Sequence, residues 1–513
     1  MRCALNRVIE KDDPIPGQHQ FVTYDNNSNL LSVIDENGKT ESYQYDALNR
    51  RIRTTDHLGN STQEAFDAVG DETGETDENG HGTVKTYDRL NRLTRETFVD
   101  GTMREYSYDE VGNVASRKDN NGNTTTYVYD NLYRLTARLY PGGNNDHFTY
   151  DPAGQLVSAS NNDAAITYAY DSDGRILSET LNGNTTAYSY DIAGRKRTIT
   201  YPGGRPIGEY RDQRERLTTI KDGGSTLATY IYDGADRDTS LSHANGVVAH
   251  YEYNHDDWLV RVRHTQGTTL IAGFEYAFDG NGNTLSEKQL HDAGRSQAYV
   301  YDAAYRLTGF RRGALVGDSI PAPTTRTQYN YDPAGNRVTV VENASATSYT
   351  TNNMNEYTTV TDSSSYPLAY DGNGNLLTDA VHTYQYDYEN RLISVDGGTT
   401  ARYYYDPFGR RIQKITPQFA SHFYYDGSRV IEERDGLGNL VIEYTYGVGI
   451  DELLRMTSGG VDYFYHPNAL GSIVAISDAL GSIVERYEYD AYGHPTIRDP
   501  SYAVIASSLE RIS

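Results

Sequence analysis

Carboxylates are the most abundant groups in this sequence that could do chemistry. Aspartate and glutamate together number 71 among 513 residues, and two facing carboxylates are the arrangement that hydrolyses glycosidic bonds. Many of these aspartates, however, open short turn-forming strings, in which an aspartate side chain accepts backbone N–H groups. Three of them, Asp151, Asp332 and Asp406, stand in Asp-Pro-x-Gly strings. The pattern favours a structural role for aspartate over acid–base catalysis.

Some acidic strings also have the composition of calcium-binding loops. Asp-x-Asn-Gly and Asp-x-Asp-Gly recur along the chain, but none completes the EF-hand pattern, which requires a glutamate at the twelfth position. Incidental calcium binding at acidic turns stays an alternative to purely structural turns, and we assign no calcium ligand.

Other candidate metal ligands and nucleophiles are scattered. His243, His250, His255 and His264 fall within 22 residues, but they lack the helical i, i+4 pairing of a zinc protease, and we expect them on different strands. Cys3 has no recognisable nucleophile context. Ser472 and Ser482 stand in twin Leu-Gly-Ser-Ile-Val strings, which are not the Gly-x-Ser-x-Gly elbow and read as turns leading into strands. We therefore assign no catalytic, cofactor-binding or metal-binding residue and no cofactor, and we predict no enzyme activity.

A short sequence repeat runs through nearly the whole chain. An aromatic residue followed by aspartate occurs seven times at a spacing of 21, and the series continues at a less regular spacing up to Tyr489. The series has 23 anchor positions, 22 of them aromatic and one a threonine (Thr351), and 18 are followed directly by aspartate. The seven regular anchors are Tyr24, Tyr45, Phe66, Tyr87, Tyr108, Tyr129 and Tyr150.

The residues around each anchor predict a β-hairpin. A second aromatic often stands two positions before the anchor, as Tyr43 does before Tyr45, which places both rings on one face of a strand. The following Asp-x-x-Gly or Asp-x-x-Asn fits a type I turn closed by a left-handed residue, with a bulge. A second turn, such as Asp35-Glu36-Asn37-Gly38, falls half a period away. Each repeat is thus strand, turn, strand, turn, and the chain is expected to contain about forty short antiparallel strands.

Three repeat architectures fit such a period. A leucine-rich horseshoe needs a leucine ladder and one strand per unit, whereas this chain has tyrosines and two strands. A β-propeller with two units per blade would need about eleven blades, more than the usual four to eight. We favour a long ribbon of hairpins that twists and curls on itself, because a flat sheet of this length would leave its faces and edges exposed.

Composition excludes several classes of protein. The formal net charge is 46 − 71 = −25, which argues against a protein that neutralises nucleic-acid phosphates. The single cysteine excludes an intramolecular disulfide framework. No apolar run has the length of a membrane span, and residues 1–20 contain no apolar core of a signal peptide. The 47 tyrosines are expected to pack in place of Leu and Phe, and as an alternative to form aromatic platforms for sugars or an unfolded guest.

The residues of the repeat carry a family resemblance. Tyr-Asp-x-x-Asn-Arg-Leu, at Tyr87–Leu93 and Tyr386–Leu392, resembles the YD repeat of the RHS (rearrangement hot spot) family. The segments 463–472 and 484–493 resemble the start of the RHS-associated core. The resemblance implies an all-β fold in which the tandem YD repeats form a spiralling antiparallel β-sheet shell. Residues 1–20 are then an N-terminal tail, 21–400 the YD/RHS repeat array, 401–496 a partial core-like region and 497–513 a C-terminal tail.

The same resemblance implies a function. In bacterial relatives the shell encloses a C-terminal toxin that is freed by self-cleavage at paired Asp-Pro-x-Gly motifs, and in animal teneurins a similar shell supports adhesion. The Asp-Pro-x-Gly strings here are isolated, so we do not expect self-cleavage, and we expect a shell that stops before the end of the core. We predict a non-catalytic scaffold for encapsulating or delivering a polymorphic toxin, secreted, at the cell surface or injected. Its expected partners are a polypeptide cargo or secretion machinery. The alternative is a cell-surface adhesion or carbohydrate-binding repeat protein, with glycans as partners.

Overall fold

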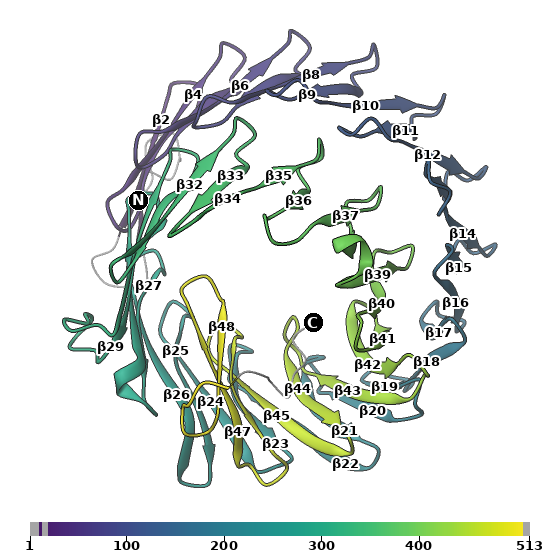
Figure 1. Cartoon of the computed structure of the whole chain (residues 1–513), viewed down its shortest axis with the longest axis vertical. Coiled ribbons are helices and arrows are strands. Elements are labelled where there is room, and N and C mark those ends of the chain that lie inside the picture. Colours follow the sequence, from purple (N-terminus) through teal and green to yellow (C-terminus); the bar gives the residue numbers. More distant parts are fainter. Residues whose placement is uncertain (1–9, 13–18, 506–513) are drawn as a thin grey trace. The chain divides into compact units, whose positions relative to one another are not determined.

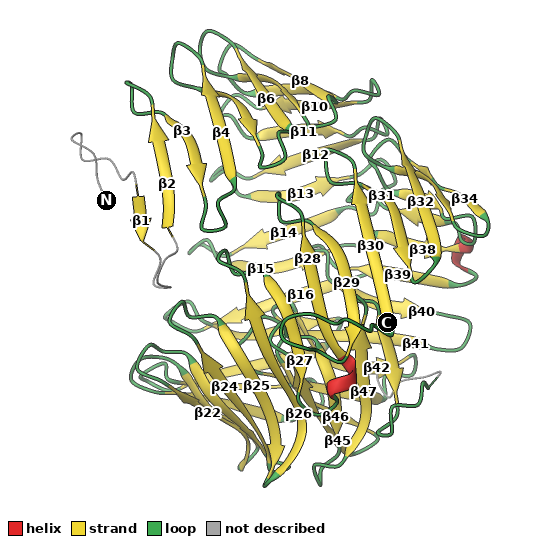
Figure 2. Ribbon diagram, turned by 90° about the vertical axis from the view of Figure 1, so that its left-hand side faces the viewer, coloured by secondary structure: helices red, strands yellow, loops and turns green. Residues whose placement is uncertain are grey.

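The computed structural model describes residues 10–12 and 19–505, and within them the chain is almost entirely β-structure (Figure 2). These residues form 48 strands and two single-turn 3₁₀ segments, η1 (Ala293–Arg295) and η2 (Asp396–Gly398). The paired strands run antiparallel to each other, as β4 (Thr40–Tyr45) and β5 (Arg51–Thr55) do. The predicted all-β fold of short antiparallel strands is confirmed.

Two compact units divide the chain. Unit 1 comprises residues 1–127, 253–258 and 276–384, and unit 2 comprises residues 128–252, 259–275 and 385–513. In each unit the strands follow one another along the ribbon (Figure 1). The boundaries at residues 20, 400 and 496, which separate the tails, the repeat array and the core-like region expected from the sequence, stay a prediction.

The strands of unit 1 lie in two stretches of the chain. They are β1 (Glu10–Asp12), β2 (His19–Tyr24), β3 (Leu30–Ile34), β4, β5, β6 (Ser61–Phe66), β7 (Glu72–Thr76), β8 (Gly82–Tyr87), β9 (Leu93–Thr97), β10 (Met103–Tyr108), β11 (Val114–Lys118), β27 (Thr284–Gln289), β28 (Ser296–Tyr301), β29 (Leu307–Gly313), β30 (Thr325–Tyr331), β31 (Arg337–Glu342), β32 (Ser345–Thr351), β33 (Tyr357–Thr361), β34 (Ser365–Pro367), β35 (Ala369–Tyr370) and β36 (Leu376–Thr378).

The strands of unit 2 form two layers. The first layer contains β13 (Leu135–Leu139), β14 (Asp146–Tyr150), β15 (Leu156–Ser160), β16 (Ala165–Tyr170), β17 (Ile176–Leu181), β18 (Asn184–Tyr190), β19 (Lys196–Thr200), β20 (Pro206–Arg211), β21 (Leu217–Asp222), β22 (Ser225–Tyr232), β23 (Asp238–His243) and β25 (Leu259–Gln266). The second layer contains β38 (Leu392–Val395), β39 (Ala401–Tyr405), β40 (Arg411–Ile415), β41 (Ala420–Asp426), β42 (Arg429–Asp435), β43 (Leu440–Tyr446), β44 (Leu453–Ser458), β45 (Val461–Pro467), β46 (Ile473–Ser477), β47 (Ile483–Tyr489) and β48 (Pro495–Arg498). Four further strands, β12 (Thr124–Tyr129), β24 (Val247–Tyr253), β26 (Thr269–Phe278) and β37 (Tyr384–Tyr386), contain residues of both units.

The turn that follows each aromatic anchor has the predicted geometry. In the repeat that begins at Tyr45, the N–H of Asn49 donates to the carbonyl of Asp46 (3.1 Å), and Asn49 is left-handed with φ 62°. The register between β4 and β5 shifts by one residue at Tyr45, which is the bulge expected for this hairpin. The Asp46 carboxylate accepts the N–H groups of Leu48 (2.9 Å) and Arg50 (3.0 Å). The repeated aspartates are therefore turn-capping groups.

In many repeats an arginine four residues after the turn aspartate, usually five after the anchor, joins that repeat to the next. The Nε of Arg50 donates to its own turn aspartate, Asp46 (2.7 Å), and its Nη1 donates to the carbonyl of Asp67 in the following repeat (2.6 Å). Its guanidinium lies 4.9 Å from the ring centroid of Phe66, the next anchor. We call this arrangement the arginine clamp. Equivalent stacks join Arg92 to Tyr108, Arg134 to Tyr150, Arg175 to Tyr190, Arg216 to Tyr232, Arg306 to Tyr331, Arg391 to Tyr405 and Arg410 to Tyr425.

The anchor tyrosines close the same junction from the other side. The hydroxyl of Tyr150 donates to the carbonyl of Leu135, the first residue of the preceding β13 (2.9 Å). Tyr232 and Tyr425 do the same to the carbonyls of Leu217 (2.6 Å) and Arg411 (2.5 Å). Each ring is thus covered by a cation and hydrogen-bonded to backbone, which satisfies its polar tip while its apolar body is shielded from water.

Paired turns tie distant parts of unit 1 together. The amide of Asn37 donates to Asp279 (2.9 Å), and the amide of Asn281 donates back to Asp35 (3.0 Å). The same reciprocal exchange joins another pair of Asp-x-Asn-Gly turns: Asn121 donates to Asp371 (2.9 Å), and Asn373 donates to Asp119 (3.0 Å). Turns that are far apart in the sequence therefore recognise each other through identical side chains.

The two layers of unit 2 pack face to face around an apolar core. Ile220 (0% exposed) and Leu241 (2%) of the first layer share one cluster with Leu454 (1%) and Phe464 (2%) of the second layer. The opposite face of the second layer buries another row, which includes Met456, Tyr465 and Ile476. Strands β44 to β46 are thus buried on both faces, which explains why their sequences lack a clean apolar–polar alternation.

The buried clamp at Arg410 provides a test of the repeat junction. Its guanidinium binds Asp406 and Glu179 (both 2.6 Å), and the side chain is 12% exposed. Arg410→Gln leaves two buried carboxylates without their cation, so we expect a loss of about 3–5 kcal/mol in the free energy of unfolding of unit 2. Urea titration and hydrogen exchange of the β40–β42 amides measure this loss.

A matched control exists at the same position of another repeat. Arg195 also stands five residues after an anchor, Tyr190, but its side chain is exposed. Arg195→Gln should change the free energy of unfolding by less than about 0.5 kcal/mol. Equal losses of unfolding free energy in the two variants would show that the buried clamp at Arg410 adds no stability of its own.

Candidate functional site

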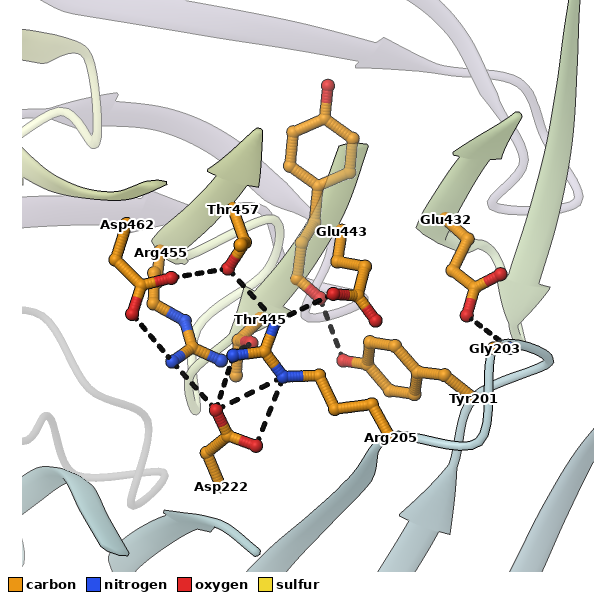
Figure 3. A network of polar contacts seen from close by, with 11 residues as sticks. Tyr201, Gly203, Arg205, Asp222, Glu432, Glu443, Thr445, Arg455, Thr457 and Asp462 are labelled. Atoms are coloured by element: carbon orange, nitrogen blue, oxygen red, sulfur yellow. Dashed lines mark hydrogen bonds and ion pairs between the residues drawn. The ribbon is translucent and has the colours of Figure 1, made fainter. Parts of the chain in front are cut away.

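A network of buried charges joins the two layers of unit 2 (Figure 3). Arg205, in the turn before β20, pairs with Asp222 at the end of β21 and reaches Glu443 of the second layer (2.7 Å). Arg455 of β44, whose side chain is 4% exposed, donates to the same Asp222 (2.9 Å) and lies 3.4 Å from Asp462. Two guanidinium groups therefore share three carboxylates across the layers.

The electrostatics of this network favour structure over acid–base chemistry. Burial opposes ionisation of Asp222, but Arg205 and Arg455 outweigh it and hold the pKa of that carboxyl below its usual value. Burial likewise opposes the charge on Arg205, yet Asp222 and Glu443 raise its pKa. Groups locked in their ionised forms make poor proton donors and acceptors at neutral pH. The network is a polar tie between the layers.

Two hydrogen bonds extend the tie along the same face. The hydroxyl of Tyr201 donates to the carbonyl of Tyr444 (2.7 Å), and the backbone N–H of Gly203 donates to the Glu432 carboxylate (2.7 Å) (Figure 3). Gly203 allows this close approach because a Cβ there would lie 2.9 Å from the same carboxylate. The turn between β19 and β20 is thus fastened to the second layer by backbone and side chain together.

Three histidines meet in the core of unit 2. His243 (6% exposed) ends β23, His264 (0%) lies on β25, and His466 (0%) lies on β45 of the second layer. The ring centroids of His243 and His466 are 5.6 Å apart, and those of His264 and His466 are 5.2 Å apart. We call these three residues the histidine cluster.

The hydrogen bonds of the cluster restrict its protonation states. His264 Nε2 lies 2.7 Å from the carbonyl oxygen of Pro467, which only accepts, so this nitrogen carries the proton. His466 Nε2 bonds the hydroxyl of Ser477 (2.7 Å), which also accepts from Asn245 (2.8 Å). Neither ring nitrogen of His243 has a hydrogen-bond partner in the described part of the chain.

The charges around the cluster oppose its protonation. Across the second layer, His466 of β45 pairs with Ala475 of β46, which pairs with Arg486 of β47, so the guanidinium faces the cluster from the same row. Burial, with a small effect of His264, lowers the pKa of His243 to about 3. Burial, with His264, His243 and Arg486 as positive neighbours, lowers the pKa of His466 well below its usual value. In the folded state His243 and His466 are therefore neutral at pH 7.

A cleft of about 540 Å³ opens elsewhere in unit 2. The turn after β13, the turn after β15 and the chain from β37 to β39 form its walls, and six tyrosines line it. Tyr140 and Tyr388 stack in parallel, with ring centroids 5.9 Å apart and an interplanar angle of 9°. The hydroxyl of Tyr140 donates to the buried carboxylate of Asp146 (2.7 Å), which also pairs with Arg138 (2.9 Å).

The structure separates the histidines singled out in the sequence. Three of them lie on different strands, as predicted: His243 on β23, His250 on β24 and His264 on β25. His255 does not, because it lies in the turn after β24. His243 and His264 approach each other through His466, whereas His250 and His255 are exposed. Within residues 10–12 and 19–505, no group of three His, Cys, Asp or Glu side chains is arranged to hold a metal ion.

The remaining candidate residues occupy the elements expected of them. Ser472 and Ser482 follow turns and precede β46 and β47. Asp151, Asp332 and Asp406 each open a turn, and each accepts a backbone N–H from the glycine three residues later (3.0–3.2 Å). Cys3 lies outside the described residues. The expectation of no catalytic, cofactor-binding or metal-binding residue stays a prediction.

Sequence reasoning missed three features of the structure: the clamp, which recurs in both units, and the histidine cluster and the cleft of unit 2. The arginine of the clamp was visible as the recurring Arg five residues after the anchor, but its stacking on the next anchor was not inferred. The histidine cluster depends on His466, which lies far along the chain from His264, and nothing local pairs them. The cleft arises from turns that are equally distant in the sequence and has no sequence signal of its own.

Comparison with known proteins identifies the repeat. The RHS repeat family matches residues 24–61, 108–145 and 170–206, and the teneurin YD-shell family matches residues 288–504. The tRNA nuclease WapA of Bacillus subtilis (strain 168) is 39% identical over 184 residues, which are 34% of this chain and 8% of that protein. The probable deoxyribonuclease RhsB of Dickeya dadantii (strain 3937) is 28% identical over 236 residues, 43% of this chain and 15% of that protein. The chain thus spans a small part of the length of these relatives.

Solved structures share the fold over nearly the whole chain. The crystal structure of TcdB2-TccC3-Cdc42 matches with a TM-score of 0.76 and 16% identity, covering 93% of this chain and 30% of that chain. The crystal structure of TcdB2-TccC3 without its hypervariable C-terminal region matches with a TM-score of 0.74, also at 16% identity, covering 93% of this chain and 30% of that chain. At this identity the likeness shows the fold alone. The two family matches and the sequence relatives, taken with the clamp repeated at the YD motifs, identify the chain as an RHS/YD-repeat protein.

The histidine cluster predicts a specific dependence of stability on pH. An imidazole with a depressed folded pKa binds fewer protons in the folded state than in the unfolded state, so the stability present above pH 6.5 is lost as the pH falls toward the folded pKa. For His243 and His466 together we expect a loss of about 4 kcal/mol between pH 8 and pH 5. His243→Gln should remove about half of that pH dependence.

Urea unfolding of the wild type and the variant at both pH values measures this effect. His250→Gln is the matched control, because His250 lies on the neighbouring β24 and is exposed. Parallel pH profiles for the wild type and His243→Gln would contradict the assignment of the pH dependence to the cluster.

Proposed function

We propose that this chain is a non-catalytic scaffold that forms part of a hollow β-shell, which encloses or delivers a C-terminal polymorphic toxin. The observation that carries the proposal is the match of 93% of the chain to the fold of toxin-complex shells. The repeat chemistry supports it, because clamps and turn caps account for the recurring aspartates, arginines and tyrosines as parts of a wall. The expected partners are a polypeptide cargo and secretion machinery.

The names of the relatives bear on catalysis only indirectly. WapA and RhsB are named as nucleases, but the matches cover 8% and 15% of those proteins. A wall of repeats with a net charge of −25 is poorly suited to bind phosphates directly. We therefore propose that this chain encloses a cargo and does not itself catalyse a reaction. The absence of nucleic-acid binding stays a prediction.

Delivery outside the producing cell is part of the proposal. One structural neighbour is named as the Photorhabdus luminescens Tc holotoxin pore, which supports a secreted, surface-bound or injected protein. Among the described residues, no helix combines the length and the apolar character needed to cross a membrane.

A second candidate function, adhesion or carbohydrate binding, is favoured by one feature. The tyrosine-lined cleft of unit 2 is a concave site of the size that small ligands occupy. Enclosing a cargo and binding a ligand are compatible functions, because a shell that encloses a polypeptide can also bind a small ligand on its wall.

Small-angle X-ray scattering tests the shell. A hollow particle of 57.4 kDa should show an excluded volume larger than that of a solid globular protein of equal mass, and a pair-distance distribution displaced toward long distances. A compact all-β protein of similar mass, measured under the same conditions, is the control. A solid particle without an internal void would contradict the proposal.

A further inference from the structure

The cleft of unit 2 combines aromatic rings with uncommitted hydrogen-bonding groups. The hydroxyls of Tyr388, Tyr403 and Tyr404 have no hydrogen-bond partner in the described part of the chain, although neighbouring anchors such as Tyr405 donate to backbone. Gln385 accepts from Ser394 through its Oε1 (2.6 Å), which leaves both amide hydrogens without a protein partner among the described residues. The tyrosines that line the cleft are Tyr140, Tyr386, Tyr388, Tyr403, Tyr404 and Tyr405.

An acceptor stands opposite these donors. One oxygen of the Asp163 carboxylate accepts from the amide of Asn144 (3.0 Å), and the other has no protein partner among the described residues. Donors and an ionisable acceptor therefore border the same space as the aromatic rings. Such polar groups are satisfied by water in the empty cleft, and a ligand that replaces this water must present both donors and acceptors.

Contacts within the cleft wall and just behind it set the shape of the cleft. The hydrogen bond from Tyr140 to Asp146, which is 0% exposed, holds one wall in place. Gly142 allows Tyr388 to lie against the turn, because a Cβ at residue 142 would be 2.9 Å from the Tyr388 hydroxyl oxygen. The stacked pair of rings is thus positioned before any ligand arrives, which lowers the entropic cost of binding.

The charges select against anionic ligands. Asp163, Asp387 and Glu389 line the cleft, and Arg391 is committed to Asp387 (2.6 Å). Arg402 adds one guanidinium at the edge. The lining thus holds three carboxylates and two guanidinium groups, so a phosphate or sulfate would meet a net negative charge. A neutral ligand meets no such repulsion.

A pyranose matches this combination. Its C–H face is apolar and packs against aromatic rings, while each of its hydroxyls both donates and accepts hydrogen bonds. We propose that the cleft bounded by Tyr140, Tyr388, Gln385 and Asp163 binds a neutral mono- or disaccharide. The volume of about 540 Å³ lies within the range of small-ligand sites. This inference rests on the second candidate function, for which it names a site and a ligand class, and it is independent of the shell.

Titration of the full chain with neutral disaccharides tests the site. Cellobiose, maltose, lactose and N,N′-diacetylchitobiose are the probes, followed by saturation-transfer NMR and calorimetry. We expect at least one of them to bind, and Gln385→Ala and Asp163→Ala each to weaken that binding about tenfold or more, because each removes a polar partner of a sugar hydroxyl. Gly142→Ala should also weaken it by displacing the Tyr388 ring.

Conservative variants separate binding from folding. Tyr388→Phe keeps the ring and removes the hydroxyl, so we expect weaker binding with an unchanged circular dichroism spectrum and an unchanged scattering profile. Tyr492→Phe is the matched control, because Tyr492 is 53% exposed in a turn that does not line the cleft, and it should bind like the wild type.

Each contrary outcome overturns the assignment. Binding of none of the four disaccharides would end it, and so would binding that the cleft variants leave unchanged. A sulfated heparin disaccharide that binds more tightly than the neutral probes would contradict the charge argument. A proline-rich peptide that binds and is lost in the cleft variants, without any sugar binding, would assign the cleft to polypeptide. The scattering test of the shell is unaffected by any of these results.

Discussion

The stacking of an arginine of one repeat on the aromatic anchor of the next is the interaction on which the ribbon depends. A two-stranded hairpin is marginally stable by itself in water, and a single repeat of this length cannot bury a core alone. The clamp ties three elements of neighbouring repeats together: its own turn aspartate, the next anchor ring and the next turn carbonyl, as Arg50 does with Asp46, Phe66 and Asp67. Stability then accumulates through nearest neighbours, as in other repeat proteins.

The clamp also explains an unusual composition. The apolar share is 37% and the chain holds 47 tyrosines, because ring faces covered by guanidinium groups replace part of an aliphatic core. In unit 1 many clamps lie near the surface, and the side chains of Arg92 and Asp88 are about one quarter exposed. In unit 2 a second layer covers the ribbon, so the clamp at Arg410 is buried and recruits Glu179 from the facing layer. The same local motif thus serves both partly exposed and buried positions of the ribbon.

Local features of this fold were predictable and distant ones were not. The spacing of Tyr45, Asp46 and Asn49 determines a hairpin because each residue acts within its own turn. The left-handed position is even kept where the sequence departs from Gly or Asn, at Tyr133 and Tyr305, because neighbouring strands impose the turn. By contrast, the ties of Arg205 to Glu443 and of His264 to Pro467 join segments that are far apart in the sequence. The partners of these residues depend on how the two layers of unit 2 pack against each other, and the spacing of residues along the chain does not indicate that packing.

The cleft occurs where the repeat is least regular. The successive anchors Tyr370, Tyr386 and Tyr405 stand closer together in the sequence than the seven regular anchors do. The strands β37 and β38 between them are only three and four residues long, and η2 replaces a tight turn after β38. A full-length hairpin fills the space beside its neighbours with its own side chains, whereas a shortened one leaves rings and polar groups without their usual partners. Tyr405 still donates to the backbone as an anchor does, while Tyr388, in the turn between the shortened strands, stacks on Tyr140 instead. Sites of this kind are expected where local sequence and the overall pattern disagree, and here that disagreement produces the concave surface that the regular repeats lack.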